Sequence, residues 1–138
     1  MPRSASCACG QLTINVSGDP GFVVACNCLN CQSRTGSVFG VSAYFEDGQV
    51  DSVVGESTLF ERVAESGNVT KRHFCPNCGG TVYWQAGSLP NKTGIGVGGF
   101  RDPSFPEPKA VVWTSSKHDW VSYPPQWLSS ETQEFERP

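Results

Sequence analysis

Seven cysteines are the residues of this chain best suited to chemistry, and every one of them lies in a short cluster. Thiols one or two residues apart close strained disulfide rings, whereas the same spacing suits the ligand geometry of a thiophilic metal such as zinc. An odd number of cysteines also prevents complete pairing. We therefore interpret the clusters as metal ligands; they are Cys7 and Cys9, then Cys26, Cys28 and Cys31, then Cys75 and Cys78.

The seven thiols divide naturally into four and three. Four thiolates complete a closed structural zinc site, whereas three leave one coordination position for water or substrate. The run Cys-Pro-Asn-Cys-Gly-Gly at 75–80 is typical of a zinc knuckle, and the Cys-x-Cys pair before Gly10 would complete its site, since residues i and i+2 of an extended segment point to the same side. The sequence thus predicts two zinc ions. The closed site comprises Cys7, Cys9, Cys75 and Cys78 (the four-cysteine cluster), and the open one Cys26, Cys28 and Cys31 (the cysteine trio).

Two histidines leave an alternative open for the trio. His73 or His118 would close the second tetrahedron and make both sites structural, although a lone histidine is more often a core or surface residue. No Ser-His-Asp arrangement, paired-carboxylate motif or H-E-x-x-H helix is visible, so the metal must carry any catalysis. Zinc held by three thiolates acidifies water weakly but binds an incoming thiol, which favours thiol chemistry over peptide hydrolysis.

The charge pattern limits the partners. The formal net charge is −3 with a pI near 5.3, and the ten basic residues are scattered, so we expect no nucleic-acid partner. Ionising the seven thiols and binding two zinc ions would bring the net charge to about −6. An anionic substrate therefore needs a local cation, and Arg34, which follows the trio most closely, is the candidate.

Short apolar runs between turns rich in glycine and proline predict a mainly β chain. A strand at 22–25 leads into the trio, and one at 69–74 leads into the knuckle. We expect a short helical turn at 32–36, a strand at 94–99 that another backbone or a ligand approaches closely, and an irregular tail from Phe105 with aromatic anchors. Further strands are expected at 11–16, 39–45, 50–54, 58–63 and 81–85, with turns at 47–48 and 66–67.

The length of 138 residues predicts a single domain over 1–138, and no stretch is long enough to cross a bilayer. The first residues lack the apolar core of a secretory signal, so we expect a cytoplasmic protein, in a compartment where structural disulfides are disfavoured.

Four segments resemble the glutathione-dependent formaldehyde-activating enzyme family. They are Ser-Cys-Ala-Cys-Gly at 6–10, Cys-Asn-Cys-Leu-Asn-Cys-Gln-Ser-Arg-Thr-Gly at 26–36, Phe-Cys-Pro-Asn-Cys-Gly at 74–79, and Val-Trp-Thr-Ser-Ser-Lys at 112–117 followed by Trp120. The resemblance spans about residues 6–127, and the three cysteine motifs occur in the family's order.

The resemblance implies a β-tent fold of small antiparallel sheets, with a structural zinc on the four-cysteine cluster and a catalytic zinc on the trio. It implies a carbon-sulfur lyase or synthase that joins or splits glutathione and formaldehyde as S-hydroxymethylglutathione. Asn27 departs from the family, which often has His there. If that His relays a proton or tunes the metal, this chain must manage otherwise.

Three functional hypotheses follow. A lyase or synthase acting on a thiol and a small carbonyl compound requires an exchangeable fourth ligand on the second zinc. A non-enzymatic zinc-stabilised binding module, with the Trp-rich tail as its partner surface, requires that zinc to be saturated. A redox or metal sensor would lose the metal on mild oxidation.

Overall fold

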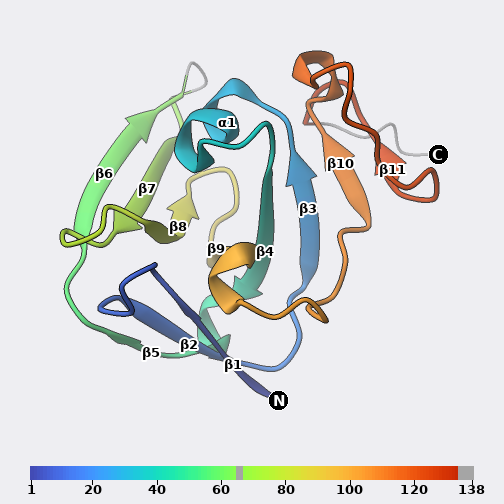
Figure 1. Cartoon of the computed structure of the whole chain (residues 1–138). Helices are drawn as coiled ribbons and strands as arrows, with labels where there is room; N and C mark the ends of the chain where they lie inside the picture. The colour runs from blue at the N-terminus through green and yellow to red at the C-terminus, as the bar shows by residue number, and fades with distance from the viewer. Residues whose placement is uncertain (65–66, 134–138) are drawn as a thin grey trace. The chain divides into compact units, whose positions relative to one another are not determined.

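The computed structural model describes residues 1–64 and 67–133, and within them the chain is mainly β, as predicted (Figure 1). No helix in these residues has the length and apolarity needed to span a membrane. The strands are β1 (Pro2–Ser6), β2 (Thr13–Ser17), β3 (Phe22–Cys26), β4 (Gly40–Glu46), β5 (Val50–Val54), β6 (Thr58–Val63), β7 (Val69–Phe74), β8 (Thr81–Ala86), β9 (Lys92–Gly96), β10 (Ala110–Val112) and β11 (Leu128–Ser129); the α-helix is α1 (Leu29–Thr35), and the 3-10 helices are η1 (Asp47–Gln49), η2 (Val97–Phe100) and η3 (Thr114–Ser116).

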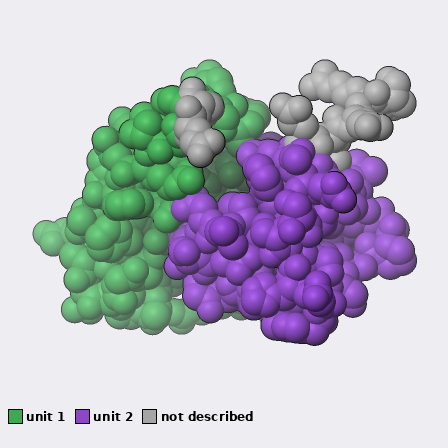
Figure 2. Space-filling model, turned by 90° about the horizontal axis from the view of Figure 1, so that it is seen from above, with its two compact units in different colours: residues 1–21, 43–105 green, residues 22–42, 106–138 purple. Residues whose placement is uncertain are grey.

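Two compact units divide the chain, and Figure 2 colours them separately. Unit 1 comprises Met1–Gly21 and Ala43–Phe105, and unit 2 comprises Phe22–Ser42 and Pro106–Pro138. Each unit is therefore built from two segments that are distant in the sequence. The four-cysteine cluster belongs to unit 1 and the cysteine trio to unit 2.

Antiparallel pairing organises unit 1. One sheet has the order β1-β2-β5, and strands β6 to β9 pair with their sequence neighbours in turn. Alternation along β2 buries Ile14 and Val16 completely, and Ala5 of β1 lies opposite Ile14 in the same core. This alternation is the pattern from which the strand was predicted.

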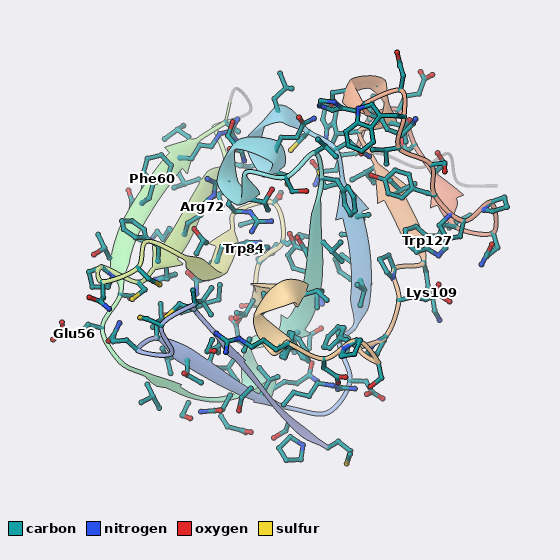
Figure 3. All side chains as sticks on the ribbon, in the orientation of Figure 1. Glu56, Phe60, Arg72, Trp84, Lys109 and Trp127 are labelled. Carbon is teal, nitrogen blue, oxygen red and sulfur yellow. The ribbon has the colours of Figure 1, made fainter. Side chains whose placement is uncertain are left out.

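The glycine-rich segment after β8 differs from its prediction. The strand expected at 94–99 begins earlier and ends at Gly96, after which residues 97–100 form η2. The close approach at Gly94 comes from a side chain, because Trp84 lies opposite it in the sheet and its indole occupies the space that a Cβ would need (Trp84 is labelled in Figure 3). Glycine is therefore required there for packing.

Parallel pairing organises unit 2. Strand β10 lies between β3 and β11 and is parallel to both, with Val112 opposite Cys26 and Ala110 opposite Leu128. The expectation of an irregular tail was wrong for β10 and β11. Both strands are too short to show an alternation of apolar and polar residues in the sequence. They are defined by their pairing with neighbouring strands. Strand β3 thus delivers Cys26 to the end of a paired strand, which is a rigid place for a ligand.

The other expected elements form with small shifts. The strands expected at 11–16, 22–25, 39–45 and 81–85 lie within two residues of the observed bounds, and those at 50–54, 58–63 and 69–74 coincide with β5, β6 and β7. Strand β1 was not anticipated. The turn expected at 47–48 is η1, whereas the one at 66–67 includes Ser66, which lies outside the described residues.

Candidate functional site

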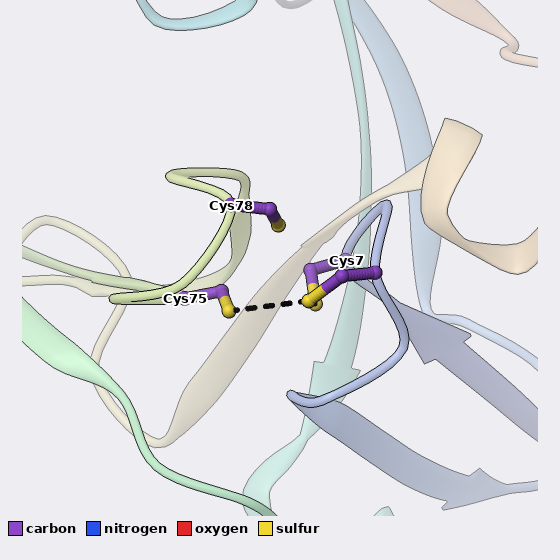
Figure 4. Close-up of side chains that lie close together, drawn as sticks. Cys7, Cys75 and Cys78 are labelled. Carbon is purple, nitrogen blue, oxygen red and sulfur yellow. Dashed lines mark hydrogen bonds between the residues drawn. The ribbon is translucent and has the colours of Figure 1, made fainter.

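The four-cysteine cluster brings together two loops of unit 1. Cys7 and Cys9 follow β1, and Cys75 and Cys78 form the turn after β7 (Figure 4). All four sulfur atoms lie within 4.8 Å of one another, with Sγ–Sγ distances of 3.7 Å from Cys9 to both Cys7 and Cys75. Four sulfurs this close to one another suit a tetrahedral thiophilic metal. The cluster can therefore hold a metal ion.

Backbone amides turn toward sulfur in the second of these loops. Gly79 takes a φ of 78° and its amide donates to the Cys75 carbonyl at 2.8 Å, which closes the turn. The Asn77 amide then donates to Cys75 Sγ at 3.3 Å. Donors that face a sulfur stabilise its thiolate form, the form a metal requires. Gly79 therefore closes the turn in which the Asn77 amide faces the Cys75 sulfur.

The first loop repeats this arrangement. Gly10 has a φ of 81°, and the Leu12 amide donates to Cys7 Sγ at 3.3 Å. Arg101 holds the loop from outside, because its Nη2 donates to the carbonyls of Cys7 and Ala8, each at 3.1 Å. Arg101 was not anticipated as a structural residue of this site, since its distance in sequence gave no signal.

Gln11 is a second contributor that the sequence did not reveal. Its Nε2 donates to Cys75 Sγ at 3.1 Å and to the Glu56 carbonyl at 3.0 Å, while its Oε1 accepts from the Glu56 amide at 2.5 Å. The side chain therefore joins the sulfur cluster to the loop between β5 and β6. Gly55 in that loop has a φ of 97°, and a Cβ there would overlap the Gln11 carbonyl.

The cysteine trio lies at the junction of β3 and α1 in unit 2. Its three sulfur atoms also lie within 4.8 Å of one another, so it too can hold a metal ion. Cys28 is the N-cap of α1, and its Sγ accepts from the Cys31 amide at 3.2 Å. The helix begins at Leu29, earlier than the helical turn expected at 32–36, and ends as expected at Gly36, whose φ is 71°. A cysteine in the capping position explains the early start, because its sulfur satisfies an amide that would otherwise lack a partner.

Hydrogen bonds among the three thiols make them unequal. Donation from Cys26 and Cys31 holds the pKa of Cys28 well below its usual range, and the bond to Cys28 together with burial raises the pKa of Cys26. Arg34, the cation singled out from the sequence, lies in the last turn of α1 and interacts electrostatically with Cys31. Its guanidinium rests against Gly40, where a Cβ would lie 2.8 Å from Nη2. Positive charge therefore lies beside the trio.

Neither histidine belongs to a cysteine cluster within residues 1–64 and 67–133. The His73 ring stacks on Tyr83 with centroids 4.3 Å apart, and its Nε2 is 2.8 Å from Gln85 Oε1. His118 Nε2 is 3.2 Å from Gln32 Oε1. The described residues thus provide the trio with three sulfur ligands and no imidazole.

Asn27, between the first two cysteines of the trio, is completely buried, and both polar atoms of its side chain are hydrogen-bonded. Its Nδ2 donates to the Val112 carbonyl at 3.0 Å, and its Oδ1 accepts from the Tyr123 hydroxyl at 2.5 Å. Its carbonyl accepts from Gln32 Nε2 and Ser116 Oγ, each at 2.9 Å. The family often has His at this position, which raised the question of a proton relay. In this chain the Asn27 side-chain amide instead hydrogen-bonds the tail to the segment that carries the trio.

A pocket of about 480 Å³ lies in the tail of unit 2, and we call it the tail pocket. Its wall combines apolar surfaces with hydroxyl groups and one lysine. The lining residues are Val111, Thr114, Lys117, Val121, Ser122, Tyr123, Pro124, Pro125, Trp127 and Ser129.

Two of three comparisons with known proteins found a match. The family model described as glutathione-dependent formaldehyde-activating enzyme matches residues 2–116. No curated protein gives a significant match. A crystal structure of a Rhodobacter sphaeroides protein is similar at 24% identity and a TM-score of 0.58, covering 72% of this chain and 91% of that one. At 24% identity this similarity shows a shared fold and nothing about function.

Proposed function

Because the chain belongs to the glutathione-dependent formaldehyde-activating enzyme family, we propose that it is a zinc-dependent carbon-sulfur lyase or synthase. Its substrates would be a thiol such as glutathione and formaldehyde or another small aldehyde. The observation that carries the proposal is the trio: three converging thiols with no fourth ligand among the described residues. A site with three protein ligands keeps a position for substrate.

The two clusters would have different roles. The four-cysteine cluster has a complete donor set, with backbone amides turned toward its sulfurs, and this supports a closed structural zinc. The trio, with zinc bound, would supply a Lewis acid that holds an incoming thiol as its thiolate. A structural ion at the first site would stabilise the folded state, since the four ligands come from segments separated by 66 residues between Cys9 and Cys75.

Residues around the trio would orient the substrates. The Cys31 amide fixes the Cys28 sulfur, and Arg34 places a positive charge beside Cys31, where it would attract an anionic thiol. In the reaction a bond forms between the thiol sulfur and the aldehyde carbon. The carbonyl π bond breaks and the thiol proton ends on the former carbonyl oxygen. The product is therefore a hemithioacetal, which for formaldehyde is an S-hydroxymethyl adduct, and the reverse reaction breaks the same carbon–sulfur bond. No oxidant or reductant is needed.

Exchange kinetics test this proposal. NMR exchange spectroscopy on glutathione and formaldehyde at equilibrium measures the rate at which they interconvert with their adduct. The native holoprotein should accelerate the exchange, Cys28→Ser should abolish the acceleration, and Lys71→Gln, a change at an exposed residue of unit 1, should retain it. Equal rates for the native chain and Cys28→Ser would remove the proposed activity.

The coordination of the second ion gives an independent check. Anomalous scattering at the zinc edge should locate one ion at each cluster, and X-ray absorption spectroscopy, which averages over both ions, should give about 3.5 sulfur ligands per zinc. Four protein ligands at the trio would favour the binding module with two structural ions and defeat the enzyme.

A further inference from the structure

Strand β6 ends the row of paired strands in unit 1, and we propose that it pairs with the same strand of a second copy of this chain. The two copies of β6 run antiparallel, with a two-fold axis that passes between the two Glu61 residues. The sheet of one copy thereby continues into the other. Because β6 belongs to unit 1 and the trio to unit 2, this homodimer is a property separate from the activity proposed above.

One side of β6 is open for such pairing. In the described part of the chain β6 pairs with β7 alone, from Thr58 opposite Phe74 to Val63 opposite Val69, and Figure 1 shows it as the last strand of the row. Alternate backbone N–H and C=O groups therefore point away from β7. Soluble proteins commonly protect such an edge with a proline or a bulge, and β6 has neither.

The side chains of β6 are exposed on both faces of the strand. All six residues are exposed, and three of them are large and apolar: Leu59 at 47%, Phe60 at 50% and Val63 at 68% exposed. Leu59 and Val63 share one face, and Phe60 lies on the other. An exposed edge strand with apolar side chains is a template for another strand.

Symmetry limits how two copies of β6 can pair. Side chains alternate between the faces of a strand, and directly opposed residues lie on the same face. The two-fold axis of the dimer must therefore pass beside a single residue, and the central candidates are Phe60, Glu61 and Arg62. An axis at Phe60 sets Glu61 against Leu59 of the second copy, whereas an axis at Arg62 sets two arginines against each other. Neither register suits its charges.

An axis at Glu61 matches the remaining side chains. Leu59 then faces Val63 of the second copy, which gives two apolar pairs by symmetry. Phe60 faces Arg62 of the second copy on the other face, which gives two cation–π pairs. Cross-strand pairs of these kinds stabilise sheets. The strand is therefore complementary to itself in this register.

Cations on β7 support the same register. Lys71 lies opposite Glu61, so the order of charges across the dimer is Lys71, Glu61, Glu61 and Lys71. The outer ammonium groups offset the repulsion between the two central carboxylates. Arg72 lies over the Phe60 ring, with Cζ 5.8 Å from the ring centroid (both are labelled in Figure 3). Each Phe60 ring in the dimer would thus have a cation on both neighbouring strands.

Sedimentation velocity on the zinc-loaded protein tests for the dimer. A contact confined to one six-residue strand is smaller than a standard interface, so we expect a dissociation constant of about 10–100 μM. The sedimentation coefficient should therefore rise from that of a monomer to that of a dimer as the protein concentration increases from about 1 to 500 μM.

A lysine on β6 should break the dimer. Val63→Lys removes both apolar pairs and should weaken dimerisation about tenfold or more. Val54→Lys is the matched control, because Val54 is 56% exposed and lies on β5, the end strand of the other sheet, and it should leave the dissociation constant unchanged. Should Val63→Lys fail to fold, Leu59→Lys changes the other member of the same pair and should have the same effect.

Mixing two charge forms tests the register. In the proposed register, Glu61→Lys places a lysine opposite Glu61 of a native copy. A mixture of this variant with ¹⁵N-labelled native protein should therefore form more heterodimer than random pairing gives, as counted by native mass spectrometry, and added salt should reduce the excess. In the other two registers residue 61 faces an apolar side chain, so mixing should give random pairing.

Three results would overturn the proposal. The first is a native protein that stays monomeric up to about 500 μM, whichever other segment binds the strand. The second is a dimer that Val63→Lys, or Leu59→Lys in its place, weakens no more than Val54→Lys does. The third is random pairing in the mixture with Glu61→Lys, because it excludes the axis at Glu61.

Discussion

The bond between the Tyr123 hydroxyl and Asn27 is the sharpest test of how the tail is held to the trio. Tyr123→Phe removes only the donor and leaves Asn27 Oδ1 as a buried acceptor without its partner. Burying an unsatisfied acceptor costs about 1–3 kcal/mol. We therefore expect the free energy of unfolding to fall by about 2 kcal/mol.

Asn27→Ala should lower the free energy of unfolding by more than Tyr123→Phe does. It deletes the bond to the Val112 carbonyl as well as the bond from Tyr123, and it leaves a small cavity where a completely buried side chain was. The combined loss is about 3–4 kcal/mol. Because both single variants break the same bond, the double variant should lose about 1 kcal/mol less than the sum of the two.

The assay is urea denaturation at a fixed free zinc concentration, because bound metal contributes to the measured stability. Tyr83→Phe is the matched control. Tyr83 is also buried, but its hydroxyl has no hydrogen-bond partner in the described part of the chain. Removing that hydroxyl should therefore lower the free energy of unfolding by less than about 0.5 kcal/mol. The reasoning would be refuted if the losses of unfolding free energy in the two single variants added up to that of the double variant. It would also be refuted if Tyr123→Phe lost no more unfolding free energy than the control.

Three further predictions concern stability and metal binding. Gly55→Ala should lower the free energy of unfolding by about 3 kcal/mol, because its φ is 97° and the new Cβ overlaps a carbonyl; Gly48→Ala, with open space around it, should change urea stability by less than about 1 kcal/mol. Gln11→Ala should weaken zinc binding about 10–100-fold in a chelator competition, because it removes a donor to the Cys75 sulfur, whereas the exposed Gln126→Ala should leave the affinity unchanged. Stripping zinc with a chelator should lower the melting temperature by more than about 10 °C in circular dichroism; an unchanged midpoint would argue against any structural ion.

The sequence was informative where spacing alone determines geometry. The Cys-x-Cys and Cys-x-x-Cys pairs, followed by glycine, place sulfurs on one side of a turn whatever surrounds them, and both clusters form as expected. Strands such as β2 were predictable because alternation of apolar residues reports burial of one face.

Tertiary contacts produced the features that could not be predicted. Arg101 and Gln11 reach the four-cysteine cluster through folding, and nothing local to either residue indicates this. Strand β10 has three residues, so its identity depends on β3 and β11 beside it. The contact partner of Gly94 was likewise invisible, because a glycine in a strand indicates close approach but does not identify what approaches.

The discontinuous make-up of unit 2 has a consequence for the order of events during synthesis. All four cysteines of the first cluster have been translated once Cys78 is complete, whereas Tyr123, whose hydroxyl donates to Asn27 within the trio, is added 45 residues later. At bacterial or eukaryotic elongation rates this interval is about 2–9 seconds. The first cluster of a nascent chain can thus bind metal before the hydrogen bond that fixes Asn27 within the trio has formed. The surroundings of the two sites would therefore be completed one after the other.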